Sequence, residues 1–302
     1  MTAPSAHTVA FLGLGHMGLP MARNLVAAGH EVHGFDLVPA AIDAARAAGI
    51  PVAGSGADAV ADADVVITMF PAGRHVIEAY RTELLAAARP GTLFIESSTI
   101  AVDEARAAHA LALAAGHRNI DAPVSGGVVG AENGTLAFMV GGSDEDHATA
   151  LPLLEVMGKR IVHCGGPGLG QAAKVCNNMV LAVSQIAVAE AFVLGERLGL
   201  EHQALFDVVS QASGQCWSIT TNCPVPGPVP TSPANRDYQP GFAGALMAKD
   251  LGLALQAIEQ TSTDARMGRL AQELYAAFAA GEGAGRDFSG IITDIRDGAP
   301  GR

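Results

Sequence analysis

The stretch VAFLGLGHMGLPMARNL, residues 9–25, decides the fold of this chain. Its first four residues form a short apolar run typical of a buried strand, and from Gly18 onward apolar residues recur at helical spacing. The glycines between have separate tasks: Gly13 permits a tight turn, Gly15 lets an anion approach the backbone, and Gly18 allows close packing of helix on strand. A strand, a glycine turn and a helix in this order predict the opening unit of a dinucleotide-binding sheet.

Asp36 completes this motif, because it follows the second expected strand, 31–35. A carboxylate there accepts hydrogen bonds from an adenosine ribose and repels a 2′-phosphate, which favours NAD over NADP. The residues expected to bind this cofactor are Gly13, Leu14, Gly15, His16, Met17, Gly18 and Asp36. Two alternatives remain open: a turn that serves packing alone, with Asp36 as a solvated strand end, or the nucleoside site of a methyltransferase.

Strand-like and helix-like segments alternate from Thr8 to about Val140. The short β-rich runs are 9–12, 31–35, 64–69, 92–96 and 118–122. Alanine-rich helical patterns such as 75–88 separate them. This alternation predicts an α/β fold with a Rossmann-like, doubly wound parallel sheet, whose carboxyl edge is where such sheets bind ligands.

After Gly168 the strand pattern stops and helical patterns take over. The expected helices are 170–198, 201–212, 243–260 and 265–280. We therefore expect an NAD-binding domain over 1–165 and an all-α domain for substrate binding and dimerisation over 166–302, linked by the long helix 170–198. A Pro-rich loop containing CPVPGPVP interrupts the helical part between Asn222 and Gly241, and loops of this length are often functional.

The composition limits the class of protein and its partners. The 302 residues include 30 acidic and 18 basic side chains, a formal net charge of −12 that disfavours binding to nucleic-acid phosphates. Four cysteines, none in C-x-x-C spacing, are typical of a reducing cytoplasm. No His/Cys/Asp cluster stands at metal-ligand spacing in the sequence, so no metal is expected.

Neither a leader sequence nor a membrane span is expected. The first strand begins by about Thr8, which leaves no room for a signal or transit peptide. The most apolar stretch, Met179–Leu194, contains Ser184, Gln185 and Glu190 and is shorter than the roughly 20 residues of a bilayer span. We interpret it as a buried helix of a cytoplasmic protein.

Only three of the basic residues are lysines, and lysine, unlike arginine, can exchange a proton near neutral pH. Lys159 lies in a Met-Gly-Lys-Arg turn typical of a surface charge. Lys174 lies in the apolar helix with Gln171 and Asn178 on the same face, and such a buried polar stripe needs internal partners or a polar ligand. For Lys174 both an internal hydrogen-bond network and a polar ligand stay open. Lys249 has a plain structural alternative to a functional role, as a snorkelling helix lysine or as half of an ion pair.

A second glycine loop, PVSGGVVG at 123–130, follows the last strand of the expected sheet. The backbone N–H groups of Gly126 and Gly127 can form a concave nest for a carboxylate, and the Ser125 hydroxyl adds a donor. By itself such a loop is common and usually binds nothing. Beside a dinucleotide and a lysine, it predicts a site for an acidic substrate.

Four stretches together resemble the β-hydroxyacid dehydrogenase family over essentially the full length of the chain. They are GLGHMGLPMARNL (13–25), DAPVSGGVVGAENGTL (121–136), GLGQAAKVCNN (168–178) and KDLGLA (249–254). Their common order and spacing make this resemblance much more specific than any one of them. His16, His75 and Glu96 differ from the Asn, Asn and Asp that are frequent in the family.

The resemblance implies a role for each matching residue. Lys174 would be the catalytic acid/base, and Asn178 would orient it and the substrate. The substrate carboxylate would bind to Ser125, Gly126 and Gly127. The cofactor contacts would be Asp36 on the adenosine ribose, Lys249 on the nicotinamide half, and Phe70, Pro71, His75 and Thr99 along the dinucleotide. We add Trp217 and the Pro-rich insert as candidates for the wall around a substrate methyl group.

The implied activity is NAD-dependent oxidation of a short β-hydroxy acid. GQCWS (214–218), CPVPG (223–227) and the stretch 232–242 resemble the branch that oxidises 3-hydroxyisobutyrate to methylmalonate semialdehyde in valine breakdown, whereas the tartronate semialdehyde branch differs there. Two alternatives remain: a dehydrogenase of L-serine or a glycerate-type acid, and a catalytically silent NAD-binding module, against which Lys174 argues. Family members form dimers or tetramers, so we expect a homo-oligomer with a small-molecule substrate and no nucleic-acid or membrane partner.

Overall fold

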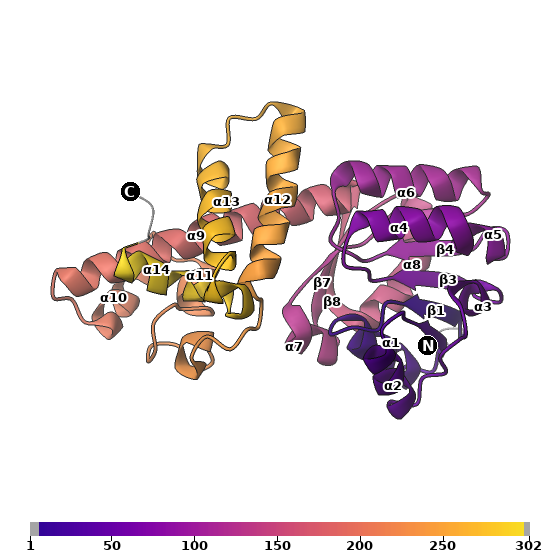
Figure 1. The fold of residues 1–302 in the computed structure, drawn as a ribbon, viewed down its shortest axis with the longest axis horizontal. Helices are drawn as coiled ribbons and strands as arrows, with labels where there is room; N and C mark the ends of the chain where they lie inside the picture. Colours follow the sequence, from indigo (N-terminus) through magenta and orange to yellow (C-terminus); the bar gives the residue numbers. More distant parts are fainter. Residues whose placement is uncertain (1–5, 299–302) are drawn as a thin grey trace. The chain divides into compact units, whose positions relative to one another are not determined.

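A computed structural model describes residues 6–298, so the outermost residues of both predicted domains lie outside the described range. The chain divides into two compact units, one ending at Lys174 and one beginning at Val175. All described strands lie in the first, the sheet unit, and the second, the helical unit, consists of helices and loops (Figure 1). The division falls inside helix α9 (Leu169–Arg197), whereas the sequence placed it at 165, before this helix.

The sheet unit contains an eight-stranded sheet in the order β2-β1-β3-β4-β5-β7-β6, with β8 paired to β7. The strands are β1 (Thr8–Leu12), β2 (Glu31–Phe35), β3 (Val65–Thr68), β4 (Leu93–Glu96), β5 (Arg118–Asp121), β6 (Val124–Ser125), β7 (Leu136–Gly141) and β8 (Gly158–Gly165). The first five are parallel, as the sequence predicted. The doubly wound α/β fold is therefore confirmed.

The far edge of the sheet differs from the purely parallel arrangement that we expected. Strand β7 runs antiparallel to β5 and β6, and β8 runs parallel to β7. The connection between β6 and β7 covers only 126–135, and a parallel crossover needs a dozen or more residues. Strand β8 was not predicted because Lys159, Arg160 and His163 interrupt its apolar residues and all but one of its residues are exposed or half-exposed.

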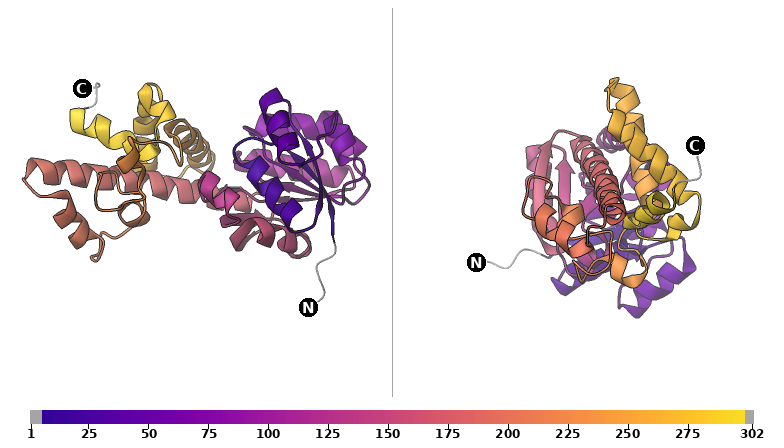
Figure 2. Two further views of the ribbon diagram at one scale, coloured as in Figure 1. Left: turned by 90° about the horizontal axis from the view of Figure 1, so that it is seen from below. Right: turned by 90° about the vertical axis from the view of Figure 1, so that its left-hand side faces the viewer.

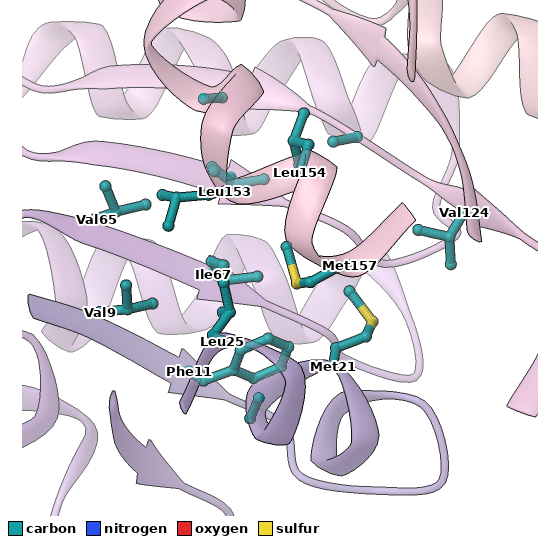
Figure 3. Close-up of a cluster of buried hydrophobic side chains, with 14 of the residues drawn as sticks. Val9, Phe11, Met21, Leu25, Val65, Ile67, Val124, Leu153, Leu154 and Met157 are labelled. Atoms are coloured by element: carbon teal, nitrogen blue, oxygen red, sulfur yellow. The ribbon is translucent and has the colours of Figure 1, made fainter. Parts of the chain in front are cut away.

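The strands alternate between two apolar cores, one on each face of the sheet. Val9 and Phe11 of β1 belong to the first core, and Ala10 and Leu12 belong to the second. Helices α1 (Gly18–Ala27) and α8 (Asp144–Met157) cover the first core, where Figure 3 shows their side chains packed on β1 and β3. On the other face lie α3 (Gly56–Val60), α4 (Gly73–Ala79) and α6 (Val102–Ala114), and helices on both faces are visible in Figure 2.

The remaining helices of this unit are short. They are α2 (Pro39–Ala47), the π-helical turn η1 (Tyr80–Leu84), α5 (Leu85–Ala87) and α7 (Gly127–Glu132). The predicted helix 75–88 is thus three consecutive pieces that begin at Gly73.

The helical unit packs around α9, α12 (Gly244–Thr261) and α13 (Arg266–Ala279), and the last two lie side by side in Figure 1. Its other elements are α10 (His202–Val209), α11 (Trp217–Thr220), η2 (Pro233–Arg236), η3 (Glu282–Gly285), η4 (Phe288–Gly290) and α14 (Ile291–Asp297). The Pro-rich insert belongs to this core, because Cys223, Val225 and Tyr238 are buried in it and Tyr238 Oη donates to Pro224 O at 2.9 Å.

Helix α9 extends well beyond the apolar run 179–194, which by itself is shorter than a bilayer span. It has 29 residues and an 18-residue window of mean hydropathy 1.6, enough to cross a membrane by length and composition alone. Half of that window is buried inside the protein, and a core helix passes the same test. Ala182, Ala189 and Phe192 lie in the core of the helical unit, so we interpret α9 as a core helix.

Candidate active site

The glycine turn after β1 has the geometry that its sequence predicts. Gly13 has φ +93°, and a Cβ on it would lie 2.2 Å from the Met69 carbonyl oxygen. A Cβ on Gly18 would lie 1.8 Å from the Gly13 carbonyl oxygen. At Gly15, in contrast, a Cβ would meet nothing within 4 Å. Two glycines thus close the turn, and the third leaves open space where a phosphate could approach the backbone at the start of α1.

Asp36 lies directly beside this turn. Its Oδ2 accepts a hydrogen bond from the Leu14 backbone N–H at 2.7 Å, and its Oδ1 accepts one from the Val38 N–H at 2.8 Å. These bonds hold a carboxylate at the carboxyl end of β2, where a ribose lies in dinucleotide folds. His16 is exposed and Met17 packs against the first core, so the turn presents a polar outer face on an apolar base.

The loops after β3 and β4 carry the other predicted cofactor residues. Phe70 donates its N–H to Ser98 Oγ at 2.7 Å, which ties the two loops together. Pro71 is exposed and Thr99 is half-buried. The Nδ1 of His75 is buried and has no hydrogen-bond partner among the described residues. An unpaired buried nitrogen, an open glycine turn and a fixed carboxylate on one sheet edge fit a bound dinucleotide.

Lys174 and the second glycine loop lie together in the sheet unit. The lysine is only 7% exposed, and its Nζ donates to the Val124 carbonyl oxygen at 2.8 Å. Val124 directly precedes Ser125, and the next two residues, Gly126 (φ +129°) and Gly127 (φ +62°), adopt conformations that favour glycine. The structure thus brings the predicted acid/base within one hydrogen bond of the predicted carboxylate loop.

Sequence reasoning placed Gln171 on the buried polar face of this helix but gave no role to Glu96 and Asp121, the two carboxylates at the start of α9. Gln171 donates from Nε2 to Ser98 O at 2.7 Å and to Glu96 Oε2 at 3.4 Å, and its Oε1 accepts from Ile100 N at 3.2 Å. Asp121 accepts from the backbone of the same helix start. The available signal was an acidic residue that closes each of two neighbouring apolar strands, at Glu96 and Asp121.

The helical unit holds its own group of predicted residues. Asn178 is 2% exposed, and its Nδ2 donates to Asp250 Oδ2 at 2.6 Å. Its Oδ1 accepts from Asn177 Nδ2 at 2.9 Å, so both ends of the amide have partners. Lys249 Nζ lies 3.9 Å from Asp250 Oδ1. The internal partners expected for a buried polar stripe are therefore present, and Asp250 is the member that sequence reasoning did not assign.

Two further expectations from the sequence concern Trp217 and a metal site. Trp217 opens α11 in the helical unit and is 50% exposed. Within residues 6–298, no group of three or more His, Cys, Asp or Glu side chains is placed to hold a metal ion.

Comparison with known families covers nearly the whole chain. Residues 8–166 match the model of the NAD binding domain of 6-phosphogluconate dehydrogenase. Residues 168–295 match the model described as NAD-binding of NADP-dependent 3-hydroxyisobutyrate dehydrogenase.

Individual relatives agree with these matches. A "probable 3-hydroxyisobutyrate dehydrogenase" of Mycobacterium tuberculosis is 60% identical over 289 residues, which cover 96% of this chain and 98% of the relative. An NAD-dependent L-serine dehydrogenase of Pseudomonas aeruginosa is 48% identical over 296 residues, or 97% of this chain and 99% of the relative.

A solved structure extends the likeness to three dimensions. Mycobacterium tuberculosis 3-hydroxyisobutyrate dehydrogenase, solved with L-serine, superposes with a TM-score of 0.94 at 59% identity over 97% of this chain and 100% of that one. With two family models and full-length relatives in agreement, the chain belongs to the 3-hydroxyisobutyrate dehydrogenase family and is an NAD-dependent oxidoreductase.

Proposed function

We propose that the chain oxidises the hydroxyl group of 3-hydroxyisobutyrate to give methylmalonate semialdehyde, as a step of valine breakdown, with Lys174 as the acid/base. The observation that carries this proposal is the placement of a buried lysine amine at the Val124 carbonyl, next to the Ser125–Gly127 loop. A substrate with a carboxylate at one end and a hydroxyl two carbons away fits a site that combines an anion nest with a proton acceptor.

Lys174 must be neutral to take the hydroxyl proton during oxidation. A neutral amine can still donate one N–H to the Val124 carbonyl and direct its lone pair at the substrate hydroxyl. Bound NAD would supply the acceptor for the hydride that leaves the carbon bearing the substrate hydroxyl. In the reverse direction the Lys174 ammonium returns its proton to the aldehyde oxygen, so one group serves both directions.

The residues around the reacting atoms would fix the geometry of substrate and cofactor. We assign the substrate carboxylate to the Ser125 hydroxyl and the backbone N–H groups of Gly126 and Gly127. Asn178 would orient the reacting groups, and its amide direction is supported by the bonds to Asn177 and Asp250. Such positioning contributes by holding the reactants at reacting distance.

The cofactor contacts follow from the sheet edge and the lysine of α12. Asp36 would bind the adenosine ribose and favour NAD over NADP, because its carboxylate repels a 2′-phosphate. Phe70, Pro71, His75 and Thr99 would line the dinucleotide. Lys249 would contact the nicotinamide half.

L-serine is a second candidate substrate, supported by specific comparisons. The Pseudomonas relative is named for L-serine, and the mycobacterial structure was solved with it. Serine and 3-hydroxyisobutyrate share the carboxylate and the hydroxyl and differ in an amino group against a methyl group. A pocket that accepts the methyl discriminates by only about 1 to 3 kcal/mol, and Trp217 is our candidate for its wall.

The test is NADH formation with (S)-3-hydroxyisobutyrate, L-serine, D-glycerate and 3-hydroxypropionate, each with NAD and with NADP. A preference for the first substrate with NAD supports the proposal. A preference for L-serine assigns the protein to the sister activity while keeping the mechanism. The matched controls are Lys174→Ala, whose turnover should fall at least about 10²-fold, and Lys159→Ala, which removes an exposed lysine and should behave as the wild type.

We further propose that the protein is a cytoplasmic homodimer or homotetramer. Large apolar side chains on the helical unit are exposed in the single chain, and association of two copies would remove such side chains from water. They include Val180, Leu194, Val208 and Met267. Light scattering after gel filtration gives the mass directly, and a monomer would contradict this proposal.

A further inference from the structure

The carboxylate of Asp121 holds the first turn of α9, the turn that leads to Lys174. Asp121 closes β5 and is 3% exposed. Its Oδ1 accepts a hydrogen bond from the Gly168 N–H at 2.7 Å, and its Oδ2 accepts one from the Gln171 N–H at 2.8 Å. A helix start leaves four backbone N–H groups without helical partners, and here one side chain from a distant strand binds two of them. Its negative charge also suits the positive end of the helix dipole.

The packing leaves no room for a larger group around this carboxylate. A Cβ on Gly141 would lie 2.4 Å from Asp121 Oδ1. A Cβ on Gly170 would lie 2.3 Å from the Met139 carbonyl oxygen and 2.8 Å from Asp121 Oδ2. Strand β7 and helix α9 therefore touch the carboxylate with bare backbone. Burial raises the pKa of Asp121, against the hydrogen bonds from Gln171 and Gly168, which lower it.

A second connection ties the same turn to the neighbouring strand. The Gln171 side chain binds Ser98 O and Ile100 N in the loop after β4. Glu96 and Asp121 are register partners on β4 and β5, so the turn is attached at the carboxyl ends of two adjacent strands. Lys174 follows Gln171 by about one helical turn.

We propose that Asp121 is a positioning residue for Lys174. By fixing the N–H groups of Gly168 and Gln171, it sets the position of the first turn of α9 and thereby holds the Lys174 amine at the Val124 carbonyl. The inference rests on the proposed role of Lys174, through which Asp121 acts on turnover. An amide in place of the carboxylate presents a donor where an acceptor is needed, so one helix N–H loses its partner and the turn shifts.

A double-mutant cycle tests this inference. Asp121→Asn is made in the wild type and in Lys174→Ala, and turnover is measured over incubations long enough to quantify the residual rate. We expect kcat to fall about ten- to hundredfold in the wild-type background, since a shift of about 1 Å at a catalytic group has such an effect. The KM for NAD should stay within about twofold. In the Lys174→Ala background we expect no further fall, because the residue that Asp121 positions is already gone.

Two measurements do not depend on activity. NAD binding, followed by titration of protein fluorescence, should be unchanged in Asp121→Asn, and amide hydrogen exchange at Gly168 and Gln171 should become faster. Leu154→Ala, a cavity variant in the core of the sheet unit, is the matched control for lost stability and should keep its kcat. If Asp121→Asn does not fold, Asp121→Ser takes its place, because a hydroxyl keeps one acceptor.

The outcomes separate the two proposals. Equal losses of kcat in both backgrounds, or no loss in either, would overturn the positioning role of Asp121. Full activity of Lys174→Ala itself would instead overturn the proposed function, whatever Asp121→Asn does. A loss confined to the wild-type background supports both.

Discussion

Two buried carboxylates, Asp121 in the sheet unit and Asp287 in the helical unit, make similar hydrogen bonds and stabilise different segments. Asp121 binds two backbone N–H groups at the start of the helix that carries Lys174. Asp287 Oδ2 binds the N–H groups of Gly241 and Phe242 at 3.0 and 3.1 Å and so closes the end of the Pro-rich insert. A buried carboxylate marks a point where distant segments are joined, and its relation to catalysis depends on what the joined segment carries.

The strongest test of this difference is Lys174→Ala. We expect turnover to fall at least about 10²-fold, because the acid/base is removed, while NAD binding stays nearly intact. Steady-state kinetics and an NAD titration measure the two effects on one preparation. If the variant retained wild-type turnover, Lys174 would not be the acid/base. Asp121 would then, like Asp287, stabilise a segment that takes no part in catalysis.

Asp287→Ala should affect stability more than chemistry. Its Oδ1 also accepts from Ser289 N at 3.0 Å and from Asn222 Nδ2 at 3.2 Å, so the variant leaves several buried donors without a partner. We expect the free energy of unfolding to fall by about 2 to 4 kcal/mol, as for other broken buried networks. Urea unfolding measures this loss. A large fall of kcat in the folded variant, with little change in stability, would remove the contrast with Asp121.

Asp36→Ala tests a third carboxylate that binds backbone N–H groups, at the edge of the glycine turn. Loss of its charge removes the repulsion of a 2′-phosphate, so the preference for NAD over NADP should relax by about tenfold or more. The ratio of kcat/KM for the two cofactors is the measurement. An unchanged ratio would show that Asp36 serves only to close the turn.

The smallest expected effect is at a carboxylate near the surface. Glu196 binds Arg296 Nη2 at 2.7 Å and His202 Nε2 at 2.8 Å, and the hydrogen bond from Arg296 lowers the pKa of Glu196. A lowered pKa in the folded state stabilises the fold above the unfolded pKa of about 4.3, and this contribution is lost as the pH falls through the folded value.

Glu196→Gln should therefore reduce the free energy of unfolding by about 0.5 to 1 kcal/mol at neutral pH. The difference from the wild type should shrink below about pH 4, where the carboxyl of the wild type becomes protonated. Urea unfolding at both pH values measures it. A difference that stays constant with pH would assign the effect to packing.

Much of the sheet unit was predictable from local patterns. The strand from Thr8, the turn at Gly13–Gly18 and the strand before Asp36 follow from apolar runs, glycines and their spacing, because each depends on residues close in sequence. The mixed far edge was not predictable, since β8 is a largely exposed or half-exposed strand of mixed polarity that is stabilised by pairing with β7. Its pairing is a tertiary contact that leaves little trace in the sequence.

The sequence by itself determined the chemistry that is available: a dinucleotide turn, a glycine loop for an anion and a lysine in an apolar helix. The tertiary structure decided which groups meet. Only in the folded chain does Lys174 reach the Val124 carbonyl, and only there does Asp121 bind the turn before it. The physical reason is that hydrogen bonds between residues about 50 positions apart depend on strand order and helix packing, which no local pattern encodes.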